Sequence, residues 1–217
     1  MKTELLKTVY NSLKYSNMLH IIVVAYERPI ALRLLIDSFL LQTCSNWEMD
    51  IVHDGPASKE VWKTIDLYKD KRIRFWQSEE RYQNYGHPNR KAMLEMIKGD
   101  PLDYVLMTND DNYYVPKFVE YFFDVCTPNV GFVYCNALTR VAYEDQITLD
   151  YRMLFTKVIC GQIDMGSFIV RLDVAKSVGF IHSEFHADGL YAEECNRYRK
   201  LKGLELLYID KPLFVHN

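Results

Sequence analysis

The clearest pattern in the chain is an alternation of short apolar runs with longer segments of helical periodicity. The run LHIIVVA at residues 19–25 is almost continuously apolar and rich in β-branched residues, as in a strand buried on both faces. Pro29, which suits the first turn of a helix, then opens the periodic segment PIALRLLIDSFLLQ. The pattern predicts a strand followed by a helix.

The same alternation continues through the first half of the chain. We expect strands at residues 47–52, 72–76 and 104–107, and helices at residues 58–68 and 89–98. Strands that alternate with helices favour a parallel sheet with helices on its faces. The predicted fold class is therefore α/β, with a single Rossmann-like, mostly parallel central sheet.

The second half is less regular. A helix near residues 116–125 and a strand near 131–135 precede a mixed region that ends at Phe168. A helix at residues 190–201 and a strand-like segment at 204–217 close the chain. Because this last strand is followed by no further element, the pattern fits a complete domain and one domain of a longer protein equally well.

Composition narrows the class of protein. With 217 residues, 49% of them hydrophobic, the chain is long enough to bury one sizeable core. The net charge of -3 and the lack of a long basic run argue against a nucleic-acid partner. The five cysteines form no CxxC pair, so we expect neither a disulfide framework nor a zinc knuckle, and we expect a reducing, cytoplasmic location.

The first 18 residues predict an amphipathic helix. Leu5, Leu6, Val9 and Leu13 share one face, but lysines interrupt the segment, which therefore lacks the apolar stretch of a secretion signal. Two interpretations stay open, a docked or frayed terminus and a peripheral contact with a membrane or a partner domain. No segment of the sequence is long and apolar enough to span a bilayer.

Candidate chemistry lies where the predicted strands end, because ligands of open α/β sheets bind at the carboxyl ends of the strands. Polar groups follow the strands at residues 26–28, 53–55 and 109–112, and Asp188 precedes the late helix. The sequence contains no GxGxxG after the first strand and no GxxxxGK[ST] anywhere, which argues against dinucleotide-binding dehydrogenases and P-loop NTPases.

The strongest signal is the pair Asp110-Asp111 directly after the apolar strand YVLM. Adjacent carboxylates repel each other unless a cation or sugar hydroxyls offset their charge, and Mn²⁺ or Mg²⁺ also binds diphosphate. The alternative is a solvated turn in which an aspartate caps the helix near Pro116.

Five segments, IIVVAYERP, IVHDGPA, NYGHPNRKA, TNDDNYYVP and HADGLYAEE, resemble in order and spacing the GT-A fold of glycosyltransferase family 2. TNDDNYYVP is especially similar to the spore-coat polysaccharide glycosyltransferases of that family. The resemblance covers residues 19–216. It implies a nucleotide-binding half at residues 19–112 and an acceptor-binding half at 113–217, with a smaller antiparallel portion of the sheet in the latter.

The resemblance also implies roles for residues around the nucleotide. Tyr26 is expected to stack on the base, and Asp54 to accept a hydrogen bond from the ring N3–H of uracil or thymine. Arg90 corresponds to the basic residue near the base and phosphates, and Arg28 is a weaker candidate of the same kind. The ordinary alternatives are a packed aromatic for Tyr26, a turn residue for Asp54 and a solvated helix charge for Arg90.

For the metal and the catalytic base, the resemblance implies Asp111 as the direct metal ligand and Asp110 on the ribose or in the metal shell, or the reverse order. His216 is expected to complete the shell, unless it is an ordinary terminal side chain. Thr108-Asn109 stand where many members carry another aspartate, so the DxD pattern is incomplete.

Asp188 corresponds to the carboxylate that takes the proton of the acceptor hydroxyl, although Ala187 replaces the usual glutamate before it. Its alternative is a helix cap, and Glu193 or Glu194 are rivals for the base. Asp164 is expected on the donor-sugar or acceptor side, or in a turn.

Together these features predict an inverting, metal-dependent glycosyltransferase. It would move a sugar from a UDP- or dTDP-sugar to a saccharide or other hydroxyl acceptor in glycan or polysaccharide synthesis. The competing hypotheses are a sugar nucleotidyltransferase, whose Gly-rich phosphate loop is missing here, and a non-catalytic nucleotide-sugar-binding module.

Overall fold

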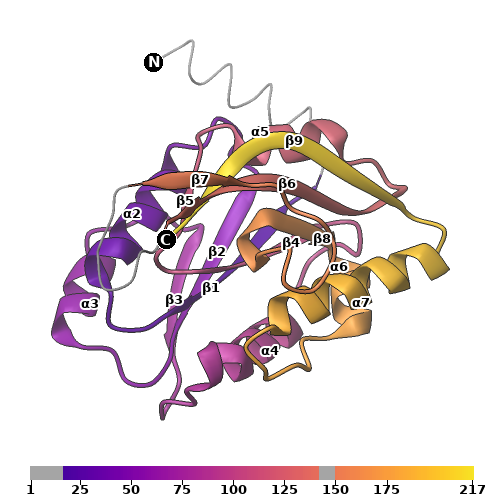
Figure 1. The fold of residues 1–217 in the computed structure, drawn as a ribbon. Helices are drawn as coiled ribbons and strands as arrows, with labels where there is room; N and C mark the ends of the chain where they lie inside the picture. Colours follow the sequence, from indigo (N-terminus) through magenta and orange to yellow (C-terminus); the bar gives the residue numbers. More distant parts are fainter. Residues whose placement is uncertain (1–16, 142–149) are drawn as a thin grey trace.

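The computed structural model describes residues 17–141 and 150–217, so the helix predicted at the N-terminus lies outside the described residues. Nine described strands form one curled sheet with helices on both faces (Figure 1). The order of the main path is β3-β2-β1-β4-β8-β6-β9-β5, and β7 pairs with β6.

The first four strands form the parallel part of the sheet. They are β1 (Leu19–Ala25), β2 (Trp47–His53), β3 (Ile73–Gln77) and β4 (Tyr104–Asn109). β1 pairs in parallel with β2 and with β4, and all seven of its residues are buried. The continuous apolar pattern of this segment therefore reflects a central strand that is covered on both faces.

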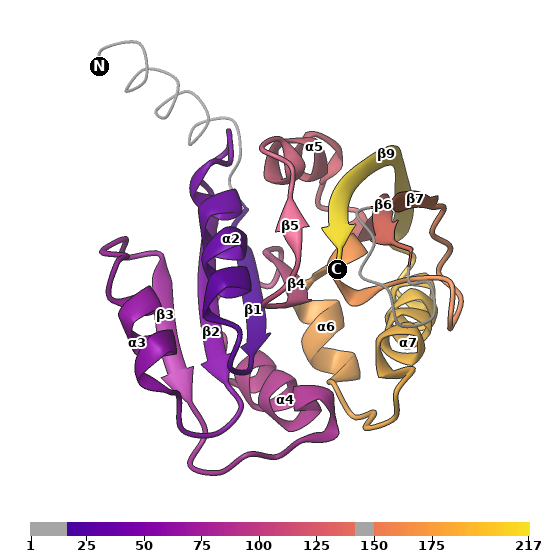
Figure 2. The ribbon, with the colours of Figure 1, turned by 60° about the vertical axis from the view of Figure 1, so that its left-hand side comes forward.

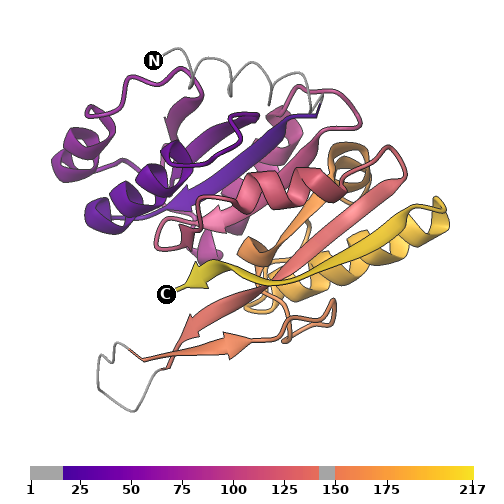
Figure 3. The ribbon, with the colours of Figure 1, turned by 90° about the horizontal axis from the view of Figure 1, so that it is seen from above.

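The remaining strands make the sheet mixed. They are β5 (Tyr113–Tyr114), β6 (Val130–Arg140), β7 (Tyr151–Leu154), β8 (Phe168–Arg171) and β9 (Glu205–His216). β8 is antiparallel to both β4 and β6, whereas β6 and β9 are parallel and lie side by side (Figure 3). The predicted α/β fold with an antiparallel portion in the C-terminal half is confirmed.

The helices divide between the two faces of the sheet. On one face lie α2 (Pro29–Leu40), α3 (Lys59–Ile65) and α5 (Phe118–Val125). On the other lie α4 (His87–Met96), α6 (Leu172–Val178) and α7 (Ala187–Leu201). Figure 2 shows α2 across β1 and β2 on one side and α4 and α6 on the other. Alternate β1 residues serve the two cores: Ile21 and Val23 pack under α2, and Ile22 and Val24 pack under α4.

The predicted helices and strands of the first half agree with the structure to within two or three residues at each end. The prediction was wrong in placing Asp188 before the late helix. α7 already begins at Ala187, because Ala187 and Gly189 are buried against the core, so Asp188 lies in its first turn after His186. Between the mixed region and the late helix, the prediction also missed β8 and the α6 helix that follows it.

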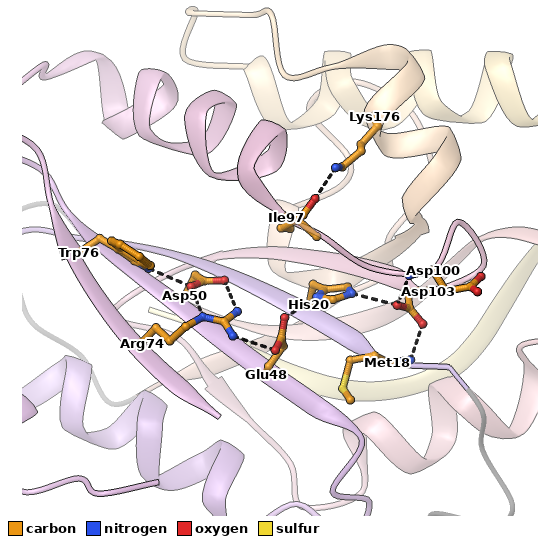
Figure 4. A network of polar contacts seen from close by, with 10 residues as sticks. All are labelled: Met18, His20, Glu48, Asp50, Arg74, Trp76, Ile97, Asp100, Asp103 and Lys176. Atoms are coloured by element: carbon orange, nitrogen blue, oxygen red, sulfur yellow. Dashed lines mark hydrogen bonds and ion pairs between the residues drawn. The ribbon is translucent and has the colours of Figure 1, made fainter. Parts of the chain in front are cut away.

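A polar network crosses the sheet at the end where β1 and β4 begin (Figure 4). His20 is buried in the apolar run of β1, with Nδ1 2.8 Å from Glu48 and Nε2 3.1 Å from Asp103. Arg74 donates to both Glu48 and Asp50. The buried His20, Asp50 and Asp103 thus all have polar partners, which offsets the cost of removing them from water.

Among the described residues, none of the helices combines the length and the apolar character needed to cross a membrane.

Candidate active site

The carboxyl ends of β1, β2 and β4 bring three predicted site residues together. The Tyr26 N–H donates to Asp110 Oδ2 at 3.0 Å, and the Asp54 N–H donates to the Ala25 carbonyl at 2.9 Å. These contacts follow from the register, in which Ala25 faces His53 and Val24 faces Asn109. Neighbouring parallel strands therefore place the polar residues that follow them at one edge.

A first cavity of 490 Å³ opens at this edge. Its lining includes Tyr26, Arg28, Asp54, Arg81 and Asn109. Tyr26 is about one-third exposed, and the Arg81 guanidinium carbon lies 3.7 Å from the centre of its ring. A flat aromatic side chain with a guanidinium above it is an arrangement on which a nucleobase can stack.

The Asp54 carboxylate has a structural role that was not predicted from the sequence. Its buried carboxylate accepts hydrogen bonds from the N–H groups of Tyr82 (3.0 Å) and Gln83 (3.1 Å) and from the Asn89 side chain (2.9 Å). The carboxylate thereby holds the segment between β3 and α4 against the end of β2. Asp54 also lines the first cavity.

The segment that Asp54 holds has an unusual backbone. Gln83, Asn84 and Tyr85, the last two in the short helix η1 (Asn84–Gly86), have φ angles of 59°, 40° and 55°. A left-handed conformation costs a residue other than glycine about 1–2 kcal/mol. Gly86 follows with φ 70°, and a Cβ there would lie 2.3 Å from Val24 Cγ1, so only glycine fits. The backbone that leads to Tyr85, and Tyr85 itself, is therefore strained.

The acidic pair lies in the turn between β4 and β5. Asp110 is fully buried, and burial raises its pKa to about 6, although the charge of Arg28 acts in the opposite direction. Arg28 bridges the pair: one guanidinium nitrogen is 2.5 Å from Asp110 Oδ1, and the other contacts Asp111 Oδ2. Arg28, the weakest of the predicted nucleotide ligands, is therefore the cation that contacts both carboxylates.

The donor set of the turn suits a hard divalent cation. Asp111 Oδ1 and Asn112 Oδ1 are buried without a hydrogen-bond partner, and buried oxygens normally have one. Carboxylate and amide oxygens are the ligands that Mg²⁺ and Mn²⁺ prefer. Over the described ranges, no three His, Cys, Asp or Glu side chains cluster closely enough to form a complete metal site. His216 Nε2 lies 3.5 Å from Asp164 Oδ2.

A second cavity, of 400 Å³, adjoins the first, because Tyr85 and Asn109 line both. Asp164, Asp188 and His216 line this second cavity as well. Burial, and then the nearby charge of Asp164, raises the pKa of Asp188. A carboxylate of raised pKa beside a cavity is a better proton acceptor than a solvated one.

Asp164 lies in a turn, which is one of the two alternatives predicted for it, and it also lines a cavity. It lines the second cavity, and its Oδ1 caps the short helix η2 (Met165–Ser167) by accepting from the Gly166 N–H at 2.8 Å. The rivals for the base are engaged elsewhere: Glu193 accepts from the Cys160 N–H, and Glu194 pairs with His182. Neither is among the residues that line the two cavities.

Arg90 lies between the cavities rather than in solvent. It is buried, its guanidinium donates to the Tyr85 carbonyl and to Asn109 Oδ1, and it lies 3.2 Å from His87 Nδ1. Burial lowers the pKa of Arg90 to about 10, while the charges of Asp164, Asp188 and Asp110 oppose this, so it stays charged at neutral pH. It provides one positive charge among the carboxylates of both cavities.

His87 is a neutral member of this cluster. Its Nε2 lies 3.1 Å from the Glu184 carbonyl and therefore donates, which leaves Nδ1 to accept from Arg90. Burial, and then the charge of Arg90, lowers its pKa to about 4. His87, Tyr85 and the exposed Phe185 line the second cavity, and the sequence analysis assigned no role to any of them. Tyr85 and His87 lie within the segment NYGHPNRKA, and Phe185 directly precedes HADGLYAEE, which was their only signal in the sequence.

Comparison with known proteins agrees with this geometry. The family model described as glycosyl transferase family 2 matches residues 20–182. No curated protein sequence matches the chain.

Several solved structures share the fold at low sequence identity. Residues 1–349 of S. aureus TarS are 16% identical with a TM-score of 0.68, and the match covers 92% of this chain and 60% of that one. The same TarS fragment in complex with UDP-GlcNAc gives 14% and 0.69, covering 92% and 58%. The mannosyltransferase PcManGT from Pyrobaculum calidifontis, in complex with GDP-Man and Mn²⁺, gives 13% and 0.65, covering 98% and 64%. The chain thus spans less than two thirds of these structures.

Proposed function

We propose that the chain, a glycosyltransferase that belongs to glycosyl transferase family 2, moves a sugar from a UDP- or dTDP-sugar to the hydroxyl of a saccharide or other acceptor. The transfer inverts the configuration at the anomeric carbon and requires Mn²⁺ or Mg²⁺. TarS with UDP-GlcNAc and the mannosyltransferase with GDP-Man and Mn²⁺ support a nucleotide-sugar donor and a divalent cation.

The observation that carries the proposal is the pair of adjoining cavities. The first contains the stacking residue Tyr26 and lies beside the acidic pair, and the second contains Asp188. Tyr85 and Asn109 line both cavities, which supports a donor whose nucleotide occupies the first cavity and whose sugar extends into the second. This agrees with a nucleotide-binding half at residues 19–112 and an acceptor side formed mainly by residues 113–217.

Asp188 is the proposed base. Its carboxylate takes the proton of the acceptor hydroxyl while that oxygen forms a bond to the anomeric carbon. The bond from that carbon to the diphosphate oxygen breaks at the same time, and its electron pair leaves with the diphosphate. Attack opposite to the leaving group inverts the anomeric configuration, and a positioned base of this kind contributes about a hundred- to ten-thousand-fold in rate.

The leaving diphosphate needs positive charge. Asp110 and Asp111 are the proposed metal ligands, and a bound divalent cation would neutralise charge on the departing diphosphate. His216 remains a candidate for the same shell. Arg90 contributes a fixed positive charge between the cavities, which holds the sugar-bearing end of the donor near Asp188.

The test is the variant Asp188→Asn. We expect UDP affinity, measured by calorimetry with Mn²⁺, to stay within about twofold, while UDP release from a panel of UDP-sugars falls at least about a hundredfold in the presence of acceptor saccharides. The matched control is Glu193→Gln on the same helix, which should keep its activity. An Asp188→Asn protein with full transfer activity would place the base elsewhere.

A further inference from the structure

Arg28 already pairs with both carboxylates that are proposed to hold the divalent cation. It comes from the loop between β1 and α2, and its guanidinium contacts one oxygen of each carboxylate of the acidic pair, Asp110 Oδ1 and Asp111 Oδ2. Within the part of the chain that the structure describes, no other lysine or arginine forms an ion pair with either carboxylate.

Arg28 and a divalent cation compete for the oxygens of the two carboxylates. Asp110 Oδ2 accepts a hydrogen bond from the Tyr26 N–H, while Asp110 Oδ1 and Asp111 Oδ1 are both buried without a hydrogen-bond partner. Of these two oxygens, Asp110 Oδ1 forms an ion pair with Arg28. A cation that uses Asp110 Oδ1 or Asp111 Oδ2 displaces Arg28 from that carboxylate. The positively charged guanidinium and a cation bound to the same two carboxylates would also repel each other.

The Arg28 side chain is partly exposed and can change its conformation. In the proposed donor complex, the diphosphate would be a second anion with which it can pair. The Arg28 side chain is 47% exposed, whereas the Asp110 side chain is 1% exposed. Arg28 also lines the first cavity together with Tyr26 and Asp54, where the proposed function puts the nucleotide and its diphosphate. An arginine that leaves the carboxylates can therefore pair with phosphate oxygens without remaining unpaired.

We propose that Arg28 is an exchangeable cation: it neutralises Asp110 and Asp111 in the free enzyme and passes to the donor diphosphate when the metal takes its place. This rests on the proposed function. Metal and nucleotide then favour each other's binding, and each raises the affinity for the other by the same factor. The carboxylates are kept paired until both ligands arrive, so that metal alone binds weakly.

The experiment measures binding, not activity. Mn²⁺ is titrated into the protein with and without saturating UDP, with bound Mn²⁺ followed by electron paramagnetic resonance and corrected for the Mn²⁺ that UDP binds in solution. In the unchanged protein we expect UDP to raise the Mn²⁺ affinity within the usual range of about 5–150-fold. In Arg28→Gln we expect Mn²⁺ alone to bind at least about tenfold more tightly and the effect of UDP to shrink.

Two further variants separate this exchange from a general loss of positive charge and from misfolding. Arg81→Gln removes the same charge from the wall of the first cavity without touching the acidic pair, so its affinity for Mn²⁺ alone should not rise. Arg28→Lys keeps a cation at the site and should keep the weak binding of Mn²⁺ alone. This variant provides a second test at position 28 if the glutamine variant misfolds.

The outcomes are distinct. If Mn²⁺ binds in all proteins with UDP but Arg28→Gln leaves the affinity for Mn²⁺ alone unchanged, the exchange is refuted while the proposed function stands. The exchange is equally refuted if Arg81→Gln tightens Mn²⁺ binding as much as Arg28→Gln does. If none of the proteins binds Mn²⁺ with or without UDP, the proposed metal dependence fails together with the exchange.

Discussion

Replacing His87 by glutamine should change how the stability of the fold depends on pH. Burial and the charge of Arg90 lower the pKa of His87 from 6.5 to about 4. Between these values the unfolded chain binds a proton at this residue and the folded chain does not, so stability falls as the pH falls. The shift corresponds to about 3 kcal/mol in total, of which about 2 kcal/mol is lost between pH 7 and pH 5.

The assay is urea unfolding followed by tryptophan fluorescence at pH 7 and pH 5 for both proteins. In His87→Gln the amide N–H is still able to donate to the Glu184 carbonyl, but the titrating ring is gone. We expect the variant to be less stable than the unchanged protein at pH 7, and this deficit to shrink by about 2 kcal/mol at pH 5. Other titrating groups cancel in the difference. A deficit that is equal at both pH values would refute the buried, neutral histidine.

Two further predictions concern the cavities. The Asp54 carboxylate is proposed to accept a hydrogen bond from the N3–H of uracil, which cytosine lacks. UDP should therefore raise the melting temperature more than CDP does at equal concentration with Mn²⁺. Equal shifts would refute the proposed contact between Asp54 and the base. Gly166→Ala should destabilise the fold by about 1–3 kcal/mol, since the added Cβ would lie 2.7 Å from Phe214 and from the Tyr114 hydroxyl. Chemical denaturation measures this loss, and an unchanged midpoint would contradict the packing around η2.

The parallel half of the fold was predictable because its signals are local. A strand buried on both faces is continuously apolar, as in β1, and Pro29 marks the start of the next helix. The residues that follow such strands are brought together by the parallel register alone, which is why Tyr26, Asp54 and Asp110 could be grouped from the sequence. The second half gave no such periodicity: β8 is only four residues long and leads directly into α6.

The site contacts missed by the sequence analysis depend on long-range packing. The pairing of Arg28 with the acidic residues joins positions 82 and 83 apart in the chain, and Arg90 reaches Asn109 across a strand end. Tyr85 faces the second cavity only because three residues in succession adopt left-handed backbone angles, for which Gln83 and Tyr85 have no intrinsic preference. His20 also shows the limit of patterns, since it lies inside an apolar run yet pairs with two carboxylates.

The hydrogen bonds of Asp54 have a consequence for changing the donor. The side chain proposed to face the nucleobase is also the anchor for the strained segment that carries Tyr85 into the neighbouring cavity. A mutation at position 54 selected for a different nucleotide would shift the wall against which the transferred sugar rests. If the proposed function holds, a change of nucleotide preference at Asp54 is therefore expected to alter the sugar preference as well.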